Sequence, residues 1–142
     1  MKIYICASKH NYSRVAEVKE ALEAKGHEIT LPNFYNAPMT EEAIKLKGSA
    51  VHKEWKAECL RAQEQKVINN DVMLVLNYEK QGQLNYIGGA TFLEVYEAWK
   101  LGKKIFFMNP IPEGMLADEL NALNPTVLNG DLSKLMPDIS EA

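Results

Sequence analysis

The amino-acid sequence predicts an α/β protein, because strand-like and helix-like segments alternate along most of its 142 residues. The strongest strand-like segment spans residues 71–77 and is apolar on both faces, as expected for a central strand of a parallel sheet. Two helix-like segments each end at a glycine, Gly26 and Gly102, and each is followed by a strand-like segment. This order is typical of a parallel sheet whose strands are joined by helices.

In the first half of the chain, residues 2–7 form a short run that predicts the first strand. After a polar loop, apolar residues recur at helical spacing over residues 12–25, and a weaker strand follows at residues 27–31. Residues 33–40 hold a proline and two aromatic residues, so we expect a loop over one end of the sheet. A further helix is expected to begin with Thr40 as its N-cap.

In the second half, a long amphipathic pattern over residues 49–70 predicts a second long helix, directly before the strand at 71–77. A polar loop and a Gly-Gly turn then lead to a helix over residues 91–101 and a strand over residues 103–108. Residues 109–113 contain two prolines, which cannot continue a helix or a central strand. The remaining expected elements are a short helix over residues 114–123 and an edge strand over residues 126–128.

Parallel strands joined by right-handed crossovers give a three-layer arrangement. The sequence therefore predicts a single three-layer flavodoxin-like (Rossmann-like) domain over residues 1–142. Its sheet is expected to be mostly parallel, with four or five strands. The length suits one hydrophobic core, and no segment rich in Gly, Ser or Pro divides the chain.

The composition argues against several classes of function. The net charge is -3, whereas a nucleic-acid-binding domain usually has a basic face, so we expect no nucleic-acid partner. No apolar segment approaches the ~18 residues of a membrane span, so we expect no membrane partner. Cys6 and Cys59 make no metal-spaced pair, and His10 and His52 stand alone, so we expect no metal site. Two unpaired cysteines fit a reducing compartment, and we expect a cytoplasmic location.

The turn from residue 85 to residue 94 is the most informative motif in the chain. It places Gly88, Gly89 and Thr91 before Glu94, where a strand edge would turn into a helix. Ligands bind at that edge of open α/β sheets, and the free N–H groups of a first helical turn favour a phosphate or a sugar oxygen. We expect Thr91 to act as an N-cap and Glu94 to lie within about one turn of the helix start.

Periodicity supports a functional interpretation of Glu94. Phe92, Val95 and Trp99 are expected to share a buried stripe, with Ala98 one turn after Glu94. A carboxylate at the edge of such a stripe is partly shielded from water, and a functional role is a common reason to tolerate this. The alternative is a carboxylate that only stabilises the helix N-terminus through the helix dipole.

Polar loops should meet at the carboxyl ends of the predicted strands, which is the usual place for a small-molecule pocket. Ser8 and Tyr12 follow the first strand, Asn77 ends the third, and Asn109 follows the fourth. Ser8 could donate to a ligand or cap its own turn, and Tyr12 could stack on a base or pack half-buried. The expected binding residues are Ser8, Tyr12, Asn77, Gly88, Gly89, Thr91 and Asn109.

The chain resembles the nucleoside 2-deoxyribosyltransferase superfamily, which includes deoxynucleoside monophosphate N-glycosidases. The resemblance rests on the opening residues 3–8, on residues 70–76 as the central strand, and on a glycine-containing turn that leads to Glu94. It continues with Ala98 and with residues 102–105, where a Gly-Lys pair precedes the next strand. The resemblance covers most of the chain.

The resemblance implies a flavodoxin-like fold, a homodimer or larger homo-oligomer, and a small-molecule nucleoside or nucleotide as substrate. It implies that Glu94 is the nucleophile, attacking the anomeric carbon of a 2-deoxyribose and displacing the base. A second base or water then releases the sugar. The resemblance implies that no metal or organic cofactor is needed.

Two positions depart from the family pattern. Gly88 stands where the family has an acid or serine six residues before the glutamate, and Gln63 stands where it has an aspartate that protonates the leaving base. Glu64 and Glu58 are near Gln63, but one residue along a helix rotates a side chain by about 100°. The role of nucleophile therefore transfers to Glu94, whereas the role of general acid transfers to no residue.

Three functions remain open from the sequence. The first is cleavage or transfer at the N-glycosidic bond of a 2-deoxynucleoside or its 5′-monophosphate. The second is a non-catalytic module that binds a nucleotide or nucleotide-sugar, which the missing aspartate favours. The third is a flavin-binding relative of flavodoxin, which the fold alone favours.

Overall fold

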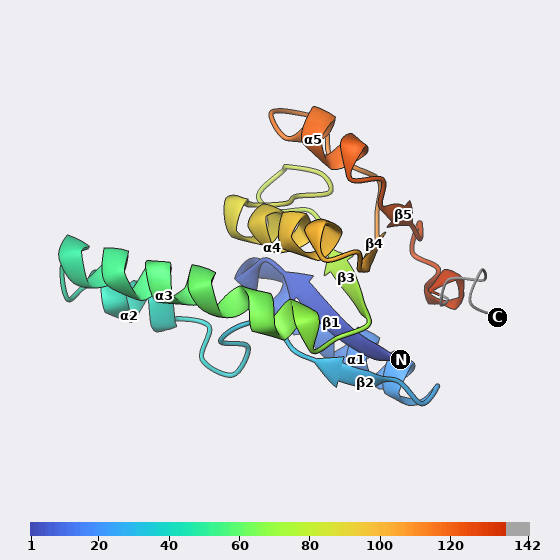
Figure 1. Ribbon diagram of the computed structural model, residues 1–142, viewed down its shortest axis with the longest axis horizontal. Helices are drawn as coiled ribbons and strands as arrows, with labels where there is room; N and C mark the ends of the chain where they lie inside the picture. The colour runs from blue at the N-terminus through green and yellow to red at the C-terminus, as the bar shows by residue number, and fades with distance from the viewer. Residues whose placement is uncertain (136–142) are drawn as a thin grey trace.

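The computed structural model describes residues 1–135, and its centre is a sheet of five parallel strands (Figure 1). The strands lie in the order β2-β1-β3-β4-β5. This order, with helices on both faces, confirms the predicted α/β flavodoxin-like architecture. The strands are β1 (Lys2–Ala7), β2 (Glu28–Thr30), β3 (Val72–Leu76), β4 (Lys104–Phe107) and β5 (Thr126–Val127).

The register of β1 and β3 brings their carboxyl ends side by side. Ile3 is opposite Val72 and Ala7 is opposite Leu76, and the two strands pair along this whole length. Every residue of β3 is buried, which explains its continuous apolar sequence. The loops that follow β1 and β3 therefore start next to each other at one edge of the sheet.

The two faces of the sheet are covered by different helices. Ile3 and Ile5 pack with α1 (Val15–Glu23) in one buried cluster. Tyr4 and Cys6 point to the other face, toward α3 (Ser49–Ile68), α4 (Gly89–Lys100) and α5 (Ala117–Ala122). Since side chains alternate along a strand, the even-numbered residues of β1 are those that meet α4.

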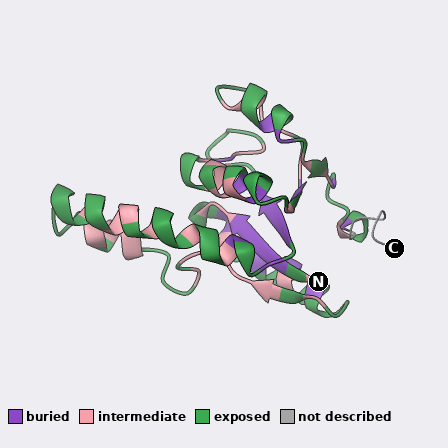
Figure 2. Cartoon of the chain, viewed as in Figure 1, coloured by how far each residue is buried: buried purple, intermediate pink, exposed green. Residues whose placement is uncertain are grey.

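The helices α2 (Thr40–Lys45) and α3 form a hairpin that extends beyond the sheet (Figure 1). Only Val67, near the end of α3, is buried, and the rest of the helix is half-buried or exposed (Figure 2). The amphipathic pattern therefore predicted the helix correctly, but most of its apolar face does not pack on the sheet. No helix among residues 1–135 is long and apolar enough to cross a membrane.

Several local expectations were wrong in detail. A 3-10 helix, η1 (Lys9–Arg14), precedes α1, where the sequence predicted a loop and then regular helix. Thr40 is the first residue of α2 and not its cap, because its hydroxyl donates to the carbonyl of Ala37. A second 3-10 helix, η2 (Leu132–Lys134), follows β5.

The start of α4 also differs from the expectation. Gly88 is the cap residue and α4 begins at Gly89, so Thr91 lies inside the first turn and caps nothing. Glu94 is consequently in the second turn, beyond the residues that the helix dipole affects most. Of the expected buried stripe, Val95 is fully buried and Phe92 is half-buried, but Trp99 is 49% exposed because it lies on the outer side of the helix.

Candidate active site

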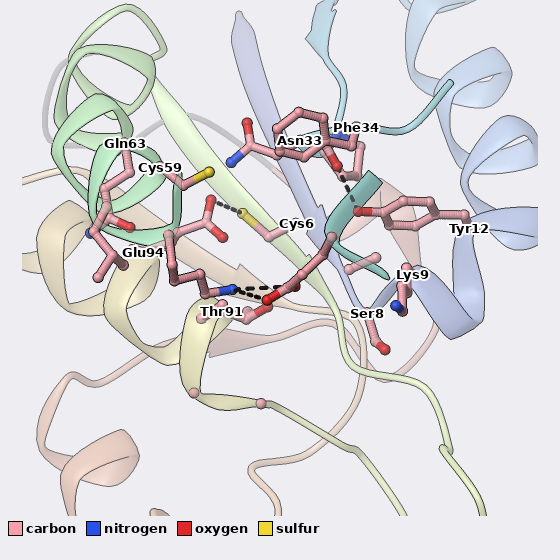
Figure 3. A pocket seen from close by; sticks show the side chains of 18 of the residues that line it. Cys6, Ser8, Lys9, Tyr12, Asn33, Phe34, Cys59, Gln63, Thr91 and Glu94 are labelled. Carbon is pink, nitrogen blue, oxygen red and sulfur yellow. Dashed lines mark hydrogen bonds and ion pairs between the residues drawn. The ribbon is translucent and has the colours of Figure 1, made fainter. Parts of the chain in front are cut away.

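A cavity of about 340 Å³ opens beside the carboxyl end of β1, on the face covered by α3 and α4 (Figure 3). Its walls come from the end of β1 and the loop after it, from the α2–α3 hairpin, and from the turn that leads into α4. The volume is in the range of small-molecule sites. The predicted residues that line it are Ser8, Tyr12, Gly88, Gly89, Thr91 and Glu94.

Glu94 points from α4 toward β1, where two donors hold its carboxylate (Figure 3). The Tyr4 hydroxyl donates to Glu94 Oε2, and the Cys6 thiol lies 3.6 Å from the same oxygen. Both donors are on the same face of β1, two residues apart. Among the described residues no hydrogen bond reaches Oε1, so this oxygen remains free for a ligand.

The electrostatics of Glu94 combine opposing effects. Burial raises the pKa of the Glu94 carboxyl above its usual value, while the hydrogen bonds from Tyr4 and Cys6 and the charges of Lys66 and Lys56 oppose this rise. Burial also raises the pKa of Tyr4 and of Cys6, and the negative charge of Glu94 adds to the effect. Tyr4 and Cys6 therefore stay protonated and remain donors to the carboxylate.

One part of the cavity wall is aromatic. Phe34 and Trp55 both line it, and their ring centroids lie 5.3 Å apart. Phe34 has a φ of 58°, a left-handed conformation that is uncommon for a bulky residue. Such strain is found mainly at ligand and active sites, where the surrounding structure maintains it.

A pair of charged residues lies beside this aromatic wall. Glu41 from α2 and Lys56 from α3 both line the cavity, and the Lys56 Nζ atom is 3.3 Å from Glu41 Oε2. The same Glu41 oxygen is 2.9 Å from His52 Nε2. Burial by itself would raise the pKa of the Glu41 carboxyl. The hydrogen bond from His52 and the charge of Lys56 outweigh burial, so the pKa is lower than usual.

Another part of the cavity wall is polar. Ser8, Lys80 and the first turn of α4 line it, and the Ser8 hydroxyl also accepts from the His10 amide at 3.4 Å. Ser8 therefore both caps η1 and faces the cavity. Lys80 Nζ lies 4.6 Å from the centre of the Tyr86 ring.

Gly88 leaves room for the side chain of Tyr86. A Cβ atom at this position would lie 2.9 Å from the Tyr86 hydroxyl, so any other residue would require the end of the tyrosine side chain to shift. The side chain of Tyr86 thus occupies the space that an acid or serine at position 88 would use. At Gly89 an added Cβ would meet no atom within 4 Å, so no protein contact requires glycine there.

Asn77 and Asn109 lie apart from the cavity that Glu94 lines. The fully buried Asn77 amide donates to the carbonyls of Asn109 and Pro110 at 2.9 and 3.0 Å and accepts from the Asn109 amide at 2.9 Å. These bonds fix the backbone after β4, where the prolines leave few partners. We therefore leave both residues out of the site proposed below.

The three α3 residues considered as general acids have different surroundings. Gln63 lines the cavity, and its amide donates to the Leu93 carbonyl at 3.4 Å. Glu64 is exposed and does not line the cavity, as the helical rotation predicted. Glu58 is exposed and ion-paired with Arg61. None of the three provides an acid inside the cavity.

Sequence reasoning missed Tyr4, Glu41, Lys56 and Trp55 as cavity residues. The alternation of β1 could have paired Tyr4 with Cys6 on one face, but not with a carboxylate 90 residues away. The spacing of Trp55, Cys59 and Gln63 on one face of α3 was also visible. The residues that face this side of α3 across the cavity could not be recognised from the sequence, because the placement of the α2–α3 hairpin is decided by tertiary packing.

A five-stranded parallel sheet with a polar and aromatic cavity at its carboxyl edge defines a flavodoxin-like protein, and the cavity lies where proteins of this fold usually bind ligands. Among residues 1–135, no three His, Cys, Asp or Glu side chains gather where they could hold a metal ion. Comparison with protein families and with curated proteins finds no match.

Among solved structures, the chain is similar to the CMP N-glycosidase BcmB of Clostridium botulinum. The TM-score is 0.53 at 15% sequence identity, and the match covers 89% of this chain and 85% of that chain. At this identity the similarity shows that the two chains share a fold.

Proposed function

We propose that this protein cleaves or transfers the N-glycosidic bond of a 2-deoxynucleoside or its 5′-monophosphate, with Glu94 as the nucleophile. The observation that carries the proposal is the carboxylate of Glu94, held by Tyr4 and Cys6 inside a cavity lined by both aromatic and polar side chains. The shared fold with a CMP N-glycosidase agrees with it. The resemblance to the deoxyribosyltransferase superfamily gives the same reaction.

The cavity suggests how a nucleotide would lie in it. A base would pack on Phe34 and Trp55, because aromatic rings prefer stacked or tilted contacts with other flat rings. The 5′ end would point to Ser8 and Lys80 and to the free N–H groups of the first turn of α4. The pentose would then lie over Glu94, between the base and the 5′ end.

In this orientation the free Oε1 atom of Glu94 attacks the anomeric carbon as the bond to the base breaks. The carboxylate stabilises the positive charge that develops on the sugar and forms a glycosyl ester with the enzyme. Water or a second base attacks the same carbon, and the bonding pair returns to Glu94. The donors Tyr4 and Cys6 hold the other oxygen in place throughout.

The test is the release of free base from a panel of deoxynucleosides and their monophosphates, measured by chromatography. We expect Glu94→Gln to bind the best substrate as well as the parent protein but to release no base. The matched control is Glu97→Gln, which removes a carboxylate one turn further along α4 and outside the cavity. Full activity of the Glu94→Gln variant would exclude Glu94 as nucleophile.

A second candidate is a non-catalytic module that binds a nucleotide or nucleotide-sugar. The observation in its favour is that Gln63, a neutral amide, faces the cavity where the family has an aspartate. Calorimetry with the same panel separates the two functions. Tight binding with no base release by the parent protein would support the module.

We also propose that the protein forms a homodimer or larger homo-oligomer in the cytoplasm. Large apolar side chains are exposed on α3 and α4, among them Val51, Leu60, Tyr96 and Trp99. A second copy could cover them. Cys6 and Cys59 are free thiols, which is consistent with a reducing compartment.

A further inference from the structure

The leaving base needs a proton, and most donors in the cavity already have acceptors. Tyr4 and Cys6 donate to Glu94, and the Tyr12 hydroxyl donates to the Asn33 carbonyl at 2.8 Å. Gln63 carries a neutral amide, which donates hydrogen bonds but does not transfer protons. In the polar part of the wall, Lys9 is ion-paired with Glu42. The cavity wall holds two further ammonium groups that could supply the proton, Lys56 and Lys80, and Lys80 lies over the ring of Tyr86.

Lys56 is positioned to supply it. It lies two helical turns before Gln63, so the two side chains share the face of α3 that lines the cavity. Its ammonium is 3.3 and 3.4 Å from the two oxygens of Glu41 and 5.9 Å from the centre of the Trp55 ring. Glu41 thus holds the ammonium next to the aromatic wall, where the proposed function puts the base.

The charges in the cavity support the same arrangement. Burial raises the pKa of the Glu94 carboxyl, and the positive charges of Lys66 and Lys56 are among the effects that oppose this rise. Glu41 occupies part of the hydrogen-bonding capacity of Lys56, since an ammonium has three N–H donors. The remaining donors are available to a ligand between Lys56 and Glu94.

We propose that Lys56 is the general acid that protonates the leaving base, positioned by Glu41; this role rests on the function proposed above. As Glu94 Oε1 bonds to the anomeric carbon, the carbon–nitrogen bond breaks and its electron pair goes to the base. A proton from Lys56 Nζ ends on the base, which leaves neutral, and Lys56 becomes an uncharged amine.

The second half of the reaction restores both groups. Lys56 takes a proton from a water molecule while the water oxygen bonds to the anomeric carbon. The bond between that carbon and Glu94 breaks, and its electron pair returns to the carboxylate. The net reaction converts one nucleotide and one water into free base and 2-deoxyribose 5-phosphate.

The experiment compares two leaving groups. One substrate is the best natural deoxynucleotide of the panel, and the other is 4-nitrophenyl 2-deoxyriboside 5-phosphate, whose phenolate leaves without a proton. We expect Lys56→Met to lose about 100-fold or more in kcat/KM on the natural substrate, because kcat/KM reports the step in which the base leaves and this loss is typical for general-acid removal. We expect a change of less than about fivefold in kcat/KM on the nitrophenyl substrate, although its kcat falls because Lys56 also takes the proton from water in the second half of the reaction. Glu94→Gln should lose activity on both.

Two further variants separate chemistry from structure. Lys56→Arg keeps a positive charge and a partner for Glu41, but arginine does not give up its proton, so this variant should lose kcat/KM on the natural substrate and keep it on the nitrophenyl substrate. Lys53→Met removes an exposed lysine one turn earlier on α3 and should change neither rate.

The outcomes are distinct. Equal loss of kcat/KM on both substrates, or no loss on either, in the folded Lys56→Met and Lys56→Arg variants would overturn the role of Lys56 and leave the nucleophile untouched. If the parent protein releases neither base nor nitrophenolate, the proposed function itself fails.

Discussion

Replacing Tyr4 by phenylalanine should move the pH dependence of the reaction. Tyr4 is 1% exposed and donates to Glu94 Oε2, and this bond is one of the effects that lower the pKa of a carboxyl that burial raises. The proposed nucleophile must be ionised to react, so activity should rise with pH as Glu94 loses its proton. Without the tyrosine hydroxyl the ionised form is less stable, and the rise should occur at higher pH.

The size of the shift follows from the strength of the bond. A hydrogen bond to a charged group contributes about 1.5–3 kcal/mol. One pKa unit corresponds to about 1.4 kcal/mol, so the acid limb of the profile should move up by about one to two units. The loss of activity in the Tyr4→Phe variant should therefore be large at low pH and small at high pH.

The assay is kcat/KM for base release as a function of pH. Tyr12→Phe is the matched control, because its hydroxyl donates to the Asn33 carbonyl and not to Glu94, and its acid limb should stay in place. An unchanged limb in Tyr4→Phe, or a limb moved to lower pH, would refute the reasoning. A uniform loss at every pH would instead assign Tyr4 a packing role.

Two further predictions concern the stability of the scaffold. Leu74 is 0% exposed in the central strand, so Leu74→Ala should lower the free energy of unfolding by about 2–5 kcal/mol. The measurement is a urea titration, and a loss under about 1 kcal/mol would argue against the register of β3. Asn77→Ala should lower the free energy of unfolding by at least about 2 kcal/mol, because backbone groups of Asn109 and Pro110 lose their hydrogen-bond partners. The KM of the variant should stay unchanged. A raised KM at unchanged stability would return Asn77 to the binding site.

Local sequence was enough to predict most of the scaffold. The apolar run at β3 and the helical spacing at α1 and α4 reflect short-range periodicity, which a sequence displays directly. Element starts were less certain, as Thr40 and Thr91 show. A threonine before a helical pattern is a common cap, but whether its hydroxyl finds a free N–H depends on where the preceding loop runs.

The candidate site could be predicted only in part. Glu94 and Gly88 were marked by a motif at a strand-to-helix turn, and Ser8 was marked by its place after the first strand. Both positions belong to one end of a parallel sheet by topology alone. Asn77 was marked for the same reason, but its buried amide fixes the backbone after β4. A polar residue at a strand end serves a ligand or a loop, and only its contacts distinguish the two.

The sequence by itself determined the order of strands and helices and the carboxylate at the edge of the sheet, because both follow from residues close together in the chain. The tertiary structure alone decided that Tyr4 would hold Glu94 and that Lys56 and Glu41 would face the same cavity. These groups come from β1, α2, α3 and α4, and no local pattern specifies how distant segments of a chain approach one another. The physical reason is that burial and charge pairing are properties of the folded packing, whereas periodicity is a property of the local backbone.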